Sequence, residues 1–305
     1  MLKRSTKYIL YKLLSLFSVI RGYNIIVIAI AQYLASIFIL GSEKRALDVL
    51  LDLNLFLIVL ASSLAIAGGY IINNFYDSEK DLINRPNKTM LDRVVSQGFK
   101  LKVYFGLNFL SAGFAFIVSW HAGVFFSAYI FWLWFYSHKL KKIPFIGNIS
   151  AALGAVLPFF GILMYFKEFN SVIFVHASLV ILLVLIRELI KDLTSIKGDL
   201  VNNYRTIPVV FGEVYTKRVI HLLSLLTLLP VKLLLSYFNV GYMFVFLYFA
   251  IILLFIINVM LLKTDGSKGY KKIHFLIKIL ILIGIFSILL IDPNVILHGK
   301  QILQL

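Results

Sequence analysis

The sequence contains no cysteine, so disulfide bonds and thiolate metal sites are excluded, and any bound metal must be held by oxygen or imidazole ligands. Charged residues are also scarce, because they make up only 14% of the 305 residues, whereas hydrophobic residues make up 61%. The apolar residues fall into runs that approach or exceed the length needed to cross a bilayer. This distribution excludes an ordinary soluble fold and predicts an all-α, polytopic integral membrane protein.

Nine apolar segments predict about nine transmembrane helices. They lie at about 23–41, 53–73, 102–119, 122–137, 148–166, 172–188, 219–237, 241–262 and 274–291. No linker divides the chain, so residues 1–305 are interpreted as one domain. Residues 1–22 mix Lys and Arg with Leu, Ile and Phe and lack a small-residue cleavage site, which favours a basic interfacial segment over a removable signal peptide.

Basic residues outnumber acidic residues by 30 to 14. If the N-terminus is cytoplasmic, all but five of the basic residues fall on the cytoplasmic side of the nine segments, which agrees with the positive-inside rule. The exceptions are Lys44, Arg45, Lys167, Lys232 and Lys300. The predicted topology is therefore N-in/C-out, in the cell (inner) membrane. Because topology explains the basic loops, we do not expect nucleic-acid binding.

A first acidic cluster lies where the second apolar segment ends. Asn73, Asp77 and Asp81 are spaced four residues apart, so on an α-helix their side chains line one face. Carboxylates this close repel one another, and a hard divalent cation such as Mg2+ is the natural partner for them. Arg85 and Lys88 follow and are able to hold a phosphate group. The alternative interpretation is an ordinary solvated helix end.

A second cluster follows the sixth apolar segment. Asp192 and Asp199 share a helical face with Glu188 and Ser195, at spacings of four, three and four residues. If this stripe faces the first, cations bound to both are able to clamp one diphosphate. Arg187 and Glu188 lie near the membrane boundary, where a structural ion pair is the alternative interpretation. Both clusters fall on the cytoplasmic side, where we expect the active site.

Taken together, these motifs resemble the UbiA superfamily of intramembrane prenyltransferases. Residues 73–81 (NNFYDSEKD) are similar to the N-D-x-x-D-x-x-x-D motif of that family, and residues 84–88 (NRPNK) are similar to the basic segment after it. Residues 136–148 resemble the characteristic central loop, and residues 187–212 resemble the second acidic motif. The second motif is most similar to the branch that contains digeranylgeranylglyceryl phosphate synthase and chlorophyll synthase.

The resemblance implies helices around a central cavity and Mg2+-dependent transfer of an isoprenyl group from an isoprenyl diphosphate to a lipophilic acceptor. It implies that Asp77, Asp81, Asp192 and Asp199 are catalytic and bind the metal together with Asn73. The residues implied to bind the diphosphate are Arg85, Lys88, Tyr136, Lys141, Arg187, Lys191 and Arg205. The apolar helices would then enclose the prenyl tail and exclude water.

Three positions depart from the family pattern. Asn74 stands where the motif usually has Asp, Ser195 replaces an acid, and Asn203 replaces a Gly. Asn is compatible with the left-handed backbone conformation that such a Gly adopts. Ser195 removes one charge from the second metal stripe.

The residues leave the acceptor open. A glycerol-phosphate ether, of the geranylgeranylglyceryl phosphate type, is slightly favoured over an aromatic acceptor of a quinone pathway. A secondary transporter is the alternative from a different class, because intramembrane acids also mark ion pathways.

Overall fold

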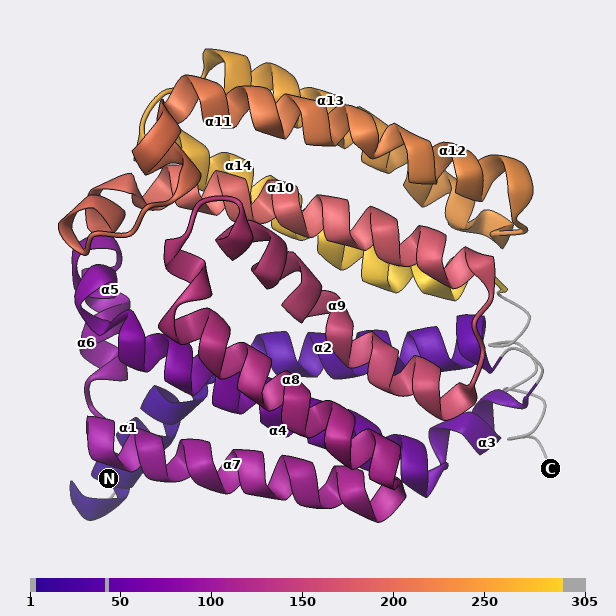
Figure 1. The fold of residues 1–305 in the computed structure, drawn as a ribbon, viewed down its shortest axis with the longest axis horizontal. Coiled ribbons are helices and arrows are strands. Elements are labelled where there is room, and N and C mark those ends of the chain that lie inside the picture. Colours follow the sequence, from indigo (N-terminus) through magenta and orange to yellow (C-terminus); the bar gives the residue numbers. More distant parts are fainter. Residues whose placement is uncertain (1–3, 42–43, 293–305) are drawn as a thin grey trace.

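The structure is a computed structural model that describes residues 4–41 and 44–292. The regular structure of these residues is entirely helical, and the long helices lie side by side as a bundle (Figure 1). The α-helices are α1 (Arg4–Val19), α2 (Gly22–Ala35), α3 (Ala46–Leu50), α4 (Leu53–Tyr76), α5 (Ser78–Asn84), α6 (Pro86–Asp92), α7 (Gln97–Val118), α8 (Trp120–His138), α9 (Ile146–Phe166), α10 (Ser171–Val201), α11 (Ile207–Leu226), α12 (Leu228–Tyr237), α13 (Phe244–Lys263) and α14 (Ser267–Ser287). Short π or 3-10 segments occupy Ser36–Leu40, Leu140–Lys142, Gly241–Met243 and Ile288–Leu290.

Eight helical segments of the described chain are long and apolar enough to cross a membrane. They are Gly22–Leu40, Leu53–Tyr76, Gln97–Val118, Ile146–Phe166, Ser171–Val201, Ile207–Tyr237, Gly241–Lys263 and Ser267–Leu290. The remaining predicted segment, 122–137, lies within α8, which has 19 residues and contacts α4 and α7. The all-helical membrane fold is confirmed, whereas the count of nine, the N-in/C-out orientation and the interfacial position of residues 1–22 stay predictions.

Helix α10 continues well beyond the apolar segment 172–188. Its 31 residues correspond to about 46 Å at 1.5 Å per residue, which exceeds the ~30 Å of the hydrocarbon layer. Hydrophobicity marks the part of a helix that lies in lipid, and the hydrogen-bonded helix does not have to end there. The second acidic cluster therefore lies on a continuous helix that also crosses the membrane.

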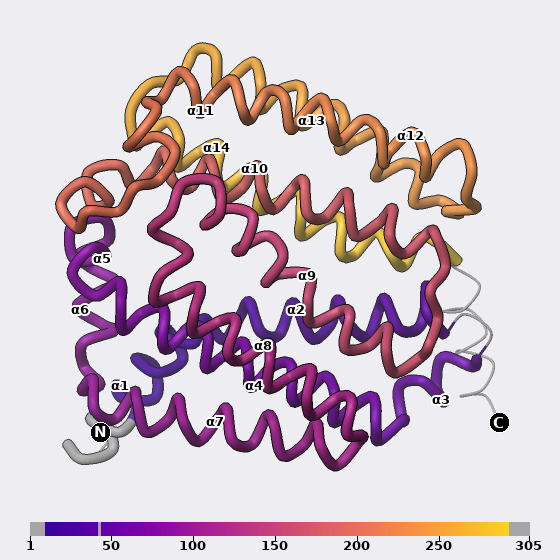
Figure 2. Tube along the Cα trace, viewed as in Figure 1, coloured from indigo at the N-terminus to yellow at the C-terminus, as the bar shows by residue number. Residues whose placement is uncertain are grey.

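The two largest apolar cores divide most of the bundle into halves. One core joins α10 to α11, α12, α13 and α14 through residues such as Ile190, Leu254 and Ile277. The other joins α2, α4, α8 and α9 through residues such as Ile58 and Phe126. Figure 2 shows α9 running obliquely between α10 and α8, both of which it contacts.

Buried polar bonds hold the first half together within its apolar core. Pro158 interrupts the hydrogen bonding of α9, and the hydroxyl of Tyr129 donates to the freed carbonyl of Gly154 at 2.9 Å. The side-chain amide of Gln32 donates to Ser62 Oγ at 3.0 Å and to the carbonyl of Pro158 at 3.2 Å. These bonds tie α2, α4, α8 and α9 into the scaffold that carries the first acidic cluster.

Candidate active site

The two acidic clusters lie at the same end of the bundle. Helix α4 ends at Tyr76 and α5 begins at Ser78, next to the segment that leads from α10 into α11 (Figure 1). Gly198 permits the close approach of α5 to α10, because a Cβ atom there would collide with the side chain of Asn84. The predicted juxtaposition of the two stripes is thus present in the fold.

The first stripe is intact across the junction between α4 and α5. The backbone N–H of Asp77 donates to the carbonyl of Asn73 at 2.9 Å, and that of Asp81 donates to Asp77 at 2.8 Å. These bonds keep the helical register although Asp77 has φ −92° and ψ 4°, outside the regular helix. The three side chains therefore stay on one face, as their spacing predicts.

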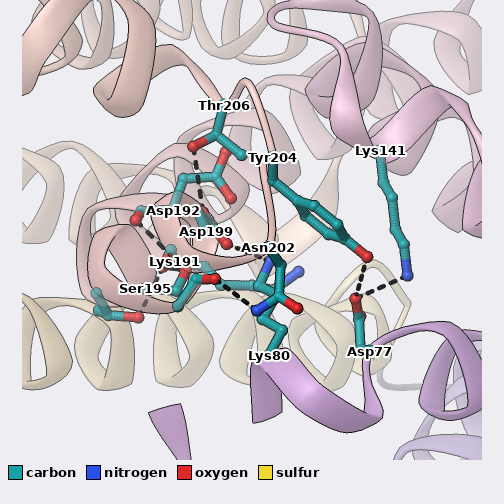
Figure 3. Close-up of polar contacts among 12 residues, drawn as sticks. Asp77, Lys80, Lys141, Lys191, Asp192, Ser195, Asp199, Asn202, Tyr204 and Thr206 are labelled. Atoms are coloured by element: carbon teal, nitrogen blue, oxygen red, sulfur yellow. Dashed lines mark hydrogen bonds and ion pairs between the residues drawn. The ribbon is translucent and has the colours of Figure 1, made fainter. Parts of the chain in front are cut away.

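Asp77 is held by side chains from two other parts of the chain (Figure 3). Lys141 Nζ lies 2.8 Å from Asp77 Oδ1 and donates to Asn73 Oδ1 at 2.8 Å, while the hydroxyl of Tyr204 donates to Asp77 Oδ1 at 3.0 Å. Burial raises the pKa of Asp77, but Lys141 and Lys80 outweigh burial, so this pKa lies below its ordinary value. Burial also lowers the pKa of Lys141 to about 8, against the opposing effect of Asp77.

Lys80 joins the two acidic clusters. Its Nζ lies 2.5 Å from Asp199 Oδ1 and 4.6 Å from the centre of the Tyr204 ring. Burial lowers the pKa of Lys80, but Asp77 and Asp199 outweigh burial, and this pKa lies above its ordinary value. Asp199 is fully buried, and its second oxygen, Oδ2, accepts a hydrogen bond from Thr206 Oγ1 at 3.1 Å. Both oxygens of Asp199 therefore have partners within the protein.

Asp192 and Glu188, which precede Asp199 on α10, have different surroundings. Asn148 donates to Asp192 Oδ2 at 2.7 Å. Glu188 is bracketed by Arg187 and Lys191, each 2.6 Å from one of its carboxylate oxygens. The structural ion pair considered for Arg187 and Glu188 is thus present, with Lys191 as a second cation.

A cavity of about 320 Å³ opens between the clusters. Its lining contains seven Lys or Arg residues and four Asp or Glu residues, so its protein wall is net positive. The basic residues are Arg21, Lys80, Arg85, Lys141, Lys191, Lys271 and Lys278. The acidic residues are Asp77, Asp81, Glu188 and Asp192. This charge balance suits a polyanion such as a diphosphate.

Most residues predicted from sequence reach this cavity. Those in its lining are Asn73, Asp77, Asp81, Arg85, Tyr136, Lys141, Lys191 and Asp192. The other four predicted residues lie outside the lining. Asp199 pairs with Lys80, and Arg187 pairs with Glu188. Lys88 Nζ lies 3.8 Å from Asp92 Oδ2, and Arg205 is exposed.

Several lining residues escaped the sequence interpretation. Lys80 lies inside the first motif, where the positive-inside rule accounts equally well for a basic residue, and Asn148 belongs to the central loop. Helix α14 contributes Lys271, His274 and Lys278. A signal for this last group exists, because Lys278 is the only Lys, Arg, Asp or Glu between residues 273 and 290.

The three departures from the family pattern have separate structural settings. Asn74 faces away from the cavity, where it donates to Asp92 Oδ2 at 3.1 Å and accepts from Lys100 at 2.9 Å. Ser195 lines the cavity, and its hydroxyl donates to the carbonyl of Lys191 at 2.9 Å. Asn203 has φ 54°, in the left-handed region that Asn tolerates.

The donors in the cavity fit a hard cation. The described part of the chain holds no preformed group of three His, Cys, Asp or Glu residues placed to bind a metal. However, no hydrogen bond or ion pair involves the Asp81 carboxylate within residues 4–41 and 44–292, and Asp192 Oδ1 is likewise uncommitted there. Together with the amide oxygen of Asn73, these oxygens are the ligand type that Mg2+ prefers.

Comparison with known proteins identifies the family. Residues 25–281 match the model of the UbiA prenyltransferase family. The chain belongs to this family. Two similar relatives are digeranylgeranylglyceryl phosphate synthases. The one from Thermococcus sibiricus is 30% identical over 77% of this chain and 83% of the relative. The one from Thermococcus gammatolerans is 29% identical over 88% of this chain and 95% of the relative. This UbiA-family chain is therefore a prenyltransferase enzyme.

Solved structures agree on the fold. A structure from work on digeranylgeranylglyceryl phosphate synthase in membranes superposes with a TM-score of 0.68 and 20% identity, covering 91% of this chain and 97% of the other. A UbiA homologue from Archaeoglobus fulgidus, bound to GPP and Mg2+, gives a TM-score of 0.66 at 16% identity, covering 90% and 99%. The UbiA fold is thus present throughout the matched chain.

Proposed function

We propose that this UbiA-family enzyme transfers an isoprenyl group, in a Mg2+-dependent reaction, from an isoprenyl diphosphate to the hydroxyl of a glycerol-phosphate ether lipid. The observation that carries the proposal is the cavity itself. Its wall is net positive and contains the carboxylates of Asp77, Asp81 and Asp192. Their oxygens either have no hydrogen-bond partner among the described residues or have partners that a cation is able to replace. We further propose that this cavity opens at the cytoplasmic face of the cell membrane. The segregation of basic residues to that end of the helices supports this orientation.

Asn73, Asp77, Asp81 and Asp192 are the proposed metal ligands that line the cavity. When bound, Mg2+ supplies electrostatic stabilisation of the charge that develops on the leaving diphosphate. Asp199, the remaining carboxylate predicted from sequence, is proposed to act through Lys80, since both of its oxygens have protein partners.

Basic side chains are proposed to bind the diphosphate directly. Lys141, Lys191 and Arg85 line the cavity and are able to donate hydrogen bonds to phosphate oxygens, and the hydroxyl of Tyr136 adds a fourth donor. The bond between prenyl C1 and the diphosphate oxygen breaks, and its electron pair leaves with the diphosphate. The acceptor oxygen then bonds to C1, and its proton passes to the released diphosphate. Lys88, Arg187 and Arg205 lie outside the cavity lining. Their positive charges are proposed to act on the diphosphate only from a distance.

The acceptor class is supported by the relatives. Those from both Thermococcus species are digeranylgeranylglyceryl phosphate synthases, which favours a glycerol-phosphate ether over an aromatic acceptor. The transporter alternative loses its support, because family membership indicates an enzyme and residues of both acidic clusters line one cavity.

The test uses purified protein, labelled geranylgeranyl diphosphate and either a glycerol-phosphate ether or an aromatic acceptor, with and without Mg2+. Asp77→Asn and Asp192→Asn are each expected to lower Mg2+-dependent product formation by about 100-fold or more. Each removes a carboxylate that is proposed to hold the Mg2+, and the Mg2+ stabilises the charge on the leaving diphosphate. Asp48→Asn is the matched control, since Asp48 is exposed and pairs with Arg45. Undiminished, Mg2+-dependent diphosphate release by both cavity variants would refute the proposed mechanism.

A further inference from the structure

Helix α14 presents a basic stripe to the cavity. Lys271, His274 and Lys278 all line it, and on a helix these positions lie within about 60° of one another around the axis. The neighbouring face of α14 is apolar, with Ile273 and Ile277 fully buried in the core shared with α10 and α13. The packing of α14 therefore points this stripe toward the site.

Lys278 occupies an unusual place for a charged residue. It lies 11 residues beyond the first residue of α14, Ser267, which corresponds to about 16 Å along the helix. It is also the only Lys, Arg, Asp or Glu in the apolar run from 273 to 290. Ionisable residues in such segments are costly, and they are usually paired or functional.

The carboxylates of the cavity do not supply the missing counter-charge. Asp77 pairs with Lys141, Glu188 pairs with Arg187 and Lys191, and Asp192 accepts a hydrogen bond from Asn148. No carboxylate forms an ion pair with Lys271 or Lys278 anywhere in residues 4–41 and 44–292. Asp81 and the remaining oxygen of Asp192 are assigned to the metal in the proposed function.

Lys278 shares the cavity wall with basic side chains from other elements. Among them are Arg21, Arg85 and Lys191. Arg21 is held in place, because its guanidinium lies 4.9 Å from the centre of the Tyr70 ring and its backbone has φ 52°. Several cations thus face the same space on the α14 side of the cavity, and an anion there would relieve their repulsion.

We propose that Lys271, His274 and Lys278 form a second anion subsite, which binds the phosphate monoester of the acceptor lipid. The inference rests on the proposed function and adds to it the group that selects the acceptor. A phosphate monoester carries about −1.5 to −2 charges at pH 7, so two lysines are able to neutralise it. The diphosphate is also anionic, and two anions in one cavity repel each other unless each has its own cations. An aromatic acceptor has no phosphate to place in this subsite.

The kinetic test compares Lys278→Gln and Lys271→Gln with Lys272→Gln, a control on the same helix at an exposed position outside the cavity lining. We expect KM for geranylgeranylglyceryl phosphate to rise about 10- to 100-fold in the first two variants, as for a lost charged hydrogen bond. KM for geranylgeranyl diphosphate is expected to change by about twofold or less, and Lys278→Arg is expected to recover most of the acceptor affinity. A rise in KM for the diphosphate instead would overturn the proposal.

A binding measurement separates the subsite from the reaction. In titration calorimetry, the wild type is expected to bind geranylgeranylglyceryl phosphate with higher affinity than geranylgeranylglycerol. Lys278→Gln is expected to remove that difference in affinity. Equal loss of both ligands, or no preference in the wild type, would overturn the subsite. If the wild type releases diphosphate but uses no glycerol-phosphate acceptor, the proposed function is wrong, and the calorimetry still decides the subsite.

The same phosphate chemistry is available from membrane lipid headgroups. We therefore repeat the titration in nanodiscs of neutral lipid and of lipid containing phosphatidylglycerol. The proposal expects the effect of Lys278→Gln on acceptor binding in both. A difference between variant and wild type that depends on the anionic lipid would assign the stripe to a headgroup and overturn the acceptor subsite.

Discussion

Replacement of Lys80 by methionine removes the ion pair that joins the two acidic clusters while keeping a side chain of similar length. Lys80 Nζ lies 2.5 Å from Asp199 Oδ1, and the two side chains are 14% and 0% exposed. Breaking a buried pair from one side costs about 3–5 kcal/mol, because the remaining charge is left without compensation. Thr206 still donates to Asp199, so we expect the lower end of this range, about 3 kcal/mol.

The expected loss is measurable as a thermal shift in detergent without Mg2+. At about 2–4 °C per kcal/mol for a chain approaching this size, the unfolding midpoint of Lys80→Met should fall by roughly 6 °C or more. Added Mg2+ should stabilise the variant more than the wild type, since the competing ammonium group is gone and a ligand stabilises the state that binds it. Lys80→Arg keeps the charge and serves as the control.

A double-mutant cycle decides whether the ion pair is responsible. Lys80→Met combined with Asp199→Asn should be less destabilised than the sum of the two single variants, because no buried charge is then left unpaired. A Lys80→Met protein as stable as the wild type, or strictly additive variants, would refute the structural role assigned to this pair.

Two further variants test the departures from the family pattern. Asn74→Asp should destabilise the protein by about 1–3 kcal/mol in thermal unfolding, because it removes the donor to Asp92 and places two carboxylates together; unchanged stability would contradict this. Ser195→Asp should lower the Mg2+ concentration for half-maximal diphosphate release several-fold, since it adds an oxygen ligand to the cavity wall. Ser195→Ala should not, and an increased Mg2+ requirement in Ser195→Asp would oppose the proposed metal position.

The features that could be predicted from sequence are those that depend on local helical geometry. The apolar runs predicted the membrane helices, and the four-residue spacing of Asn73, Asp77 and Asp81 predicted their common face. Asn203 lies in the turn after α10 with φ 54°, which Asn tolerates, so its departure from the family's Gly is compatible with the turn. The extent of α10 was not predictable from hydrophobicity, which reports lipid contact and not helix length.

The composition and spacing by themselves determined a helical membrane protein with two acidic stripes. Only the tertiary structure decided which carboxylates face the cavity, since Asp192 lines it whereas Asp199 is enclosed by Lys80 and Thr206. It also brought the stripe of Lys278 on α14 to the site. The physical reason is that apolar helix surfaces are as compatible with lipid as with one another, so a run of Leu and Ile specifies membrane insertion without specifying the neighbour.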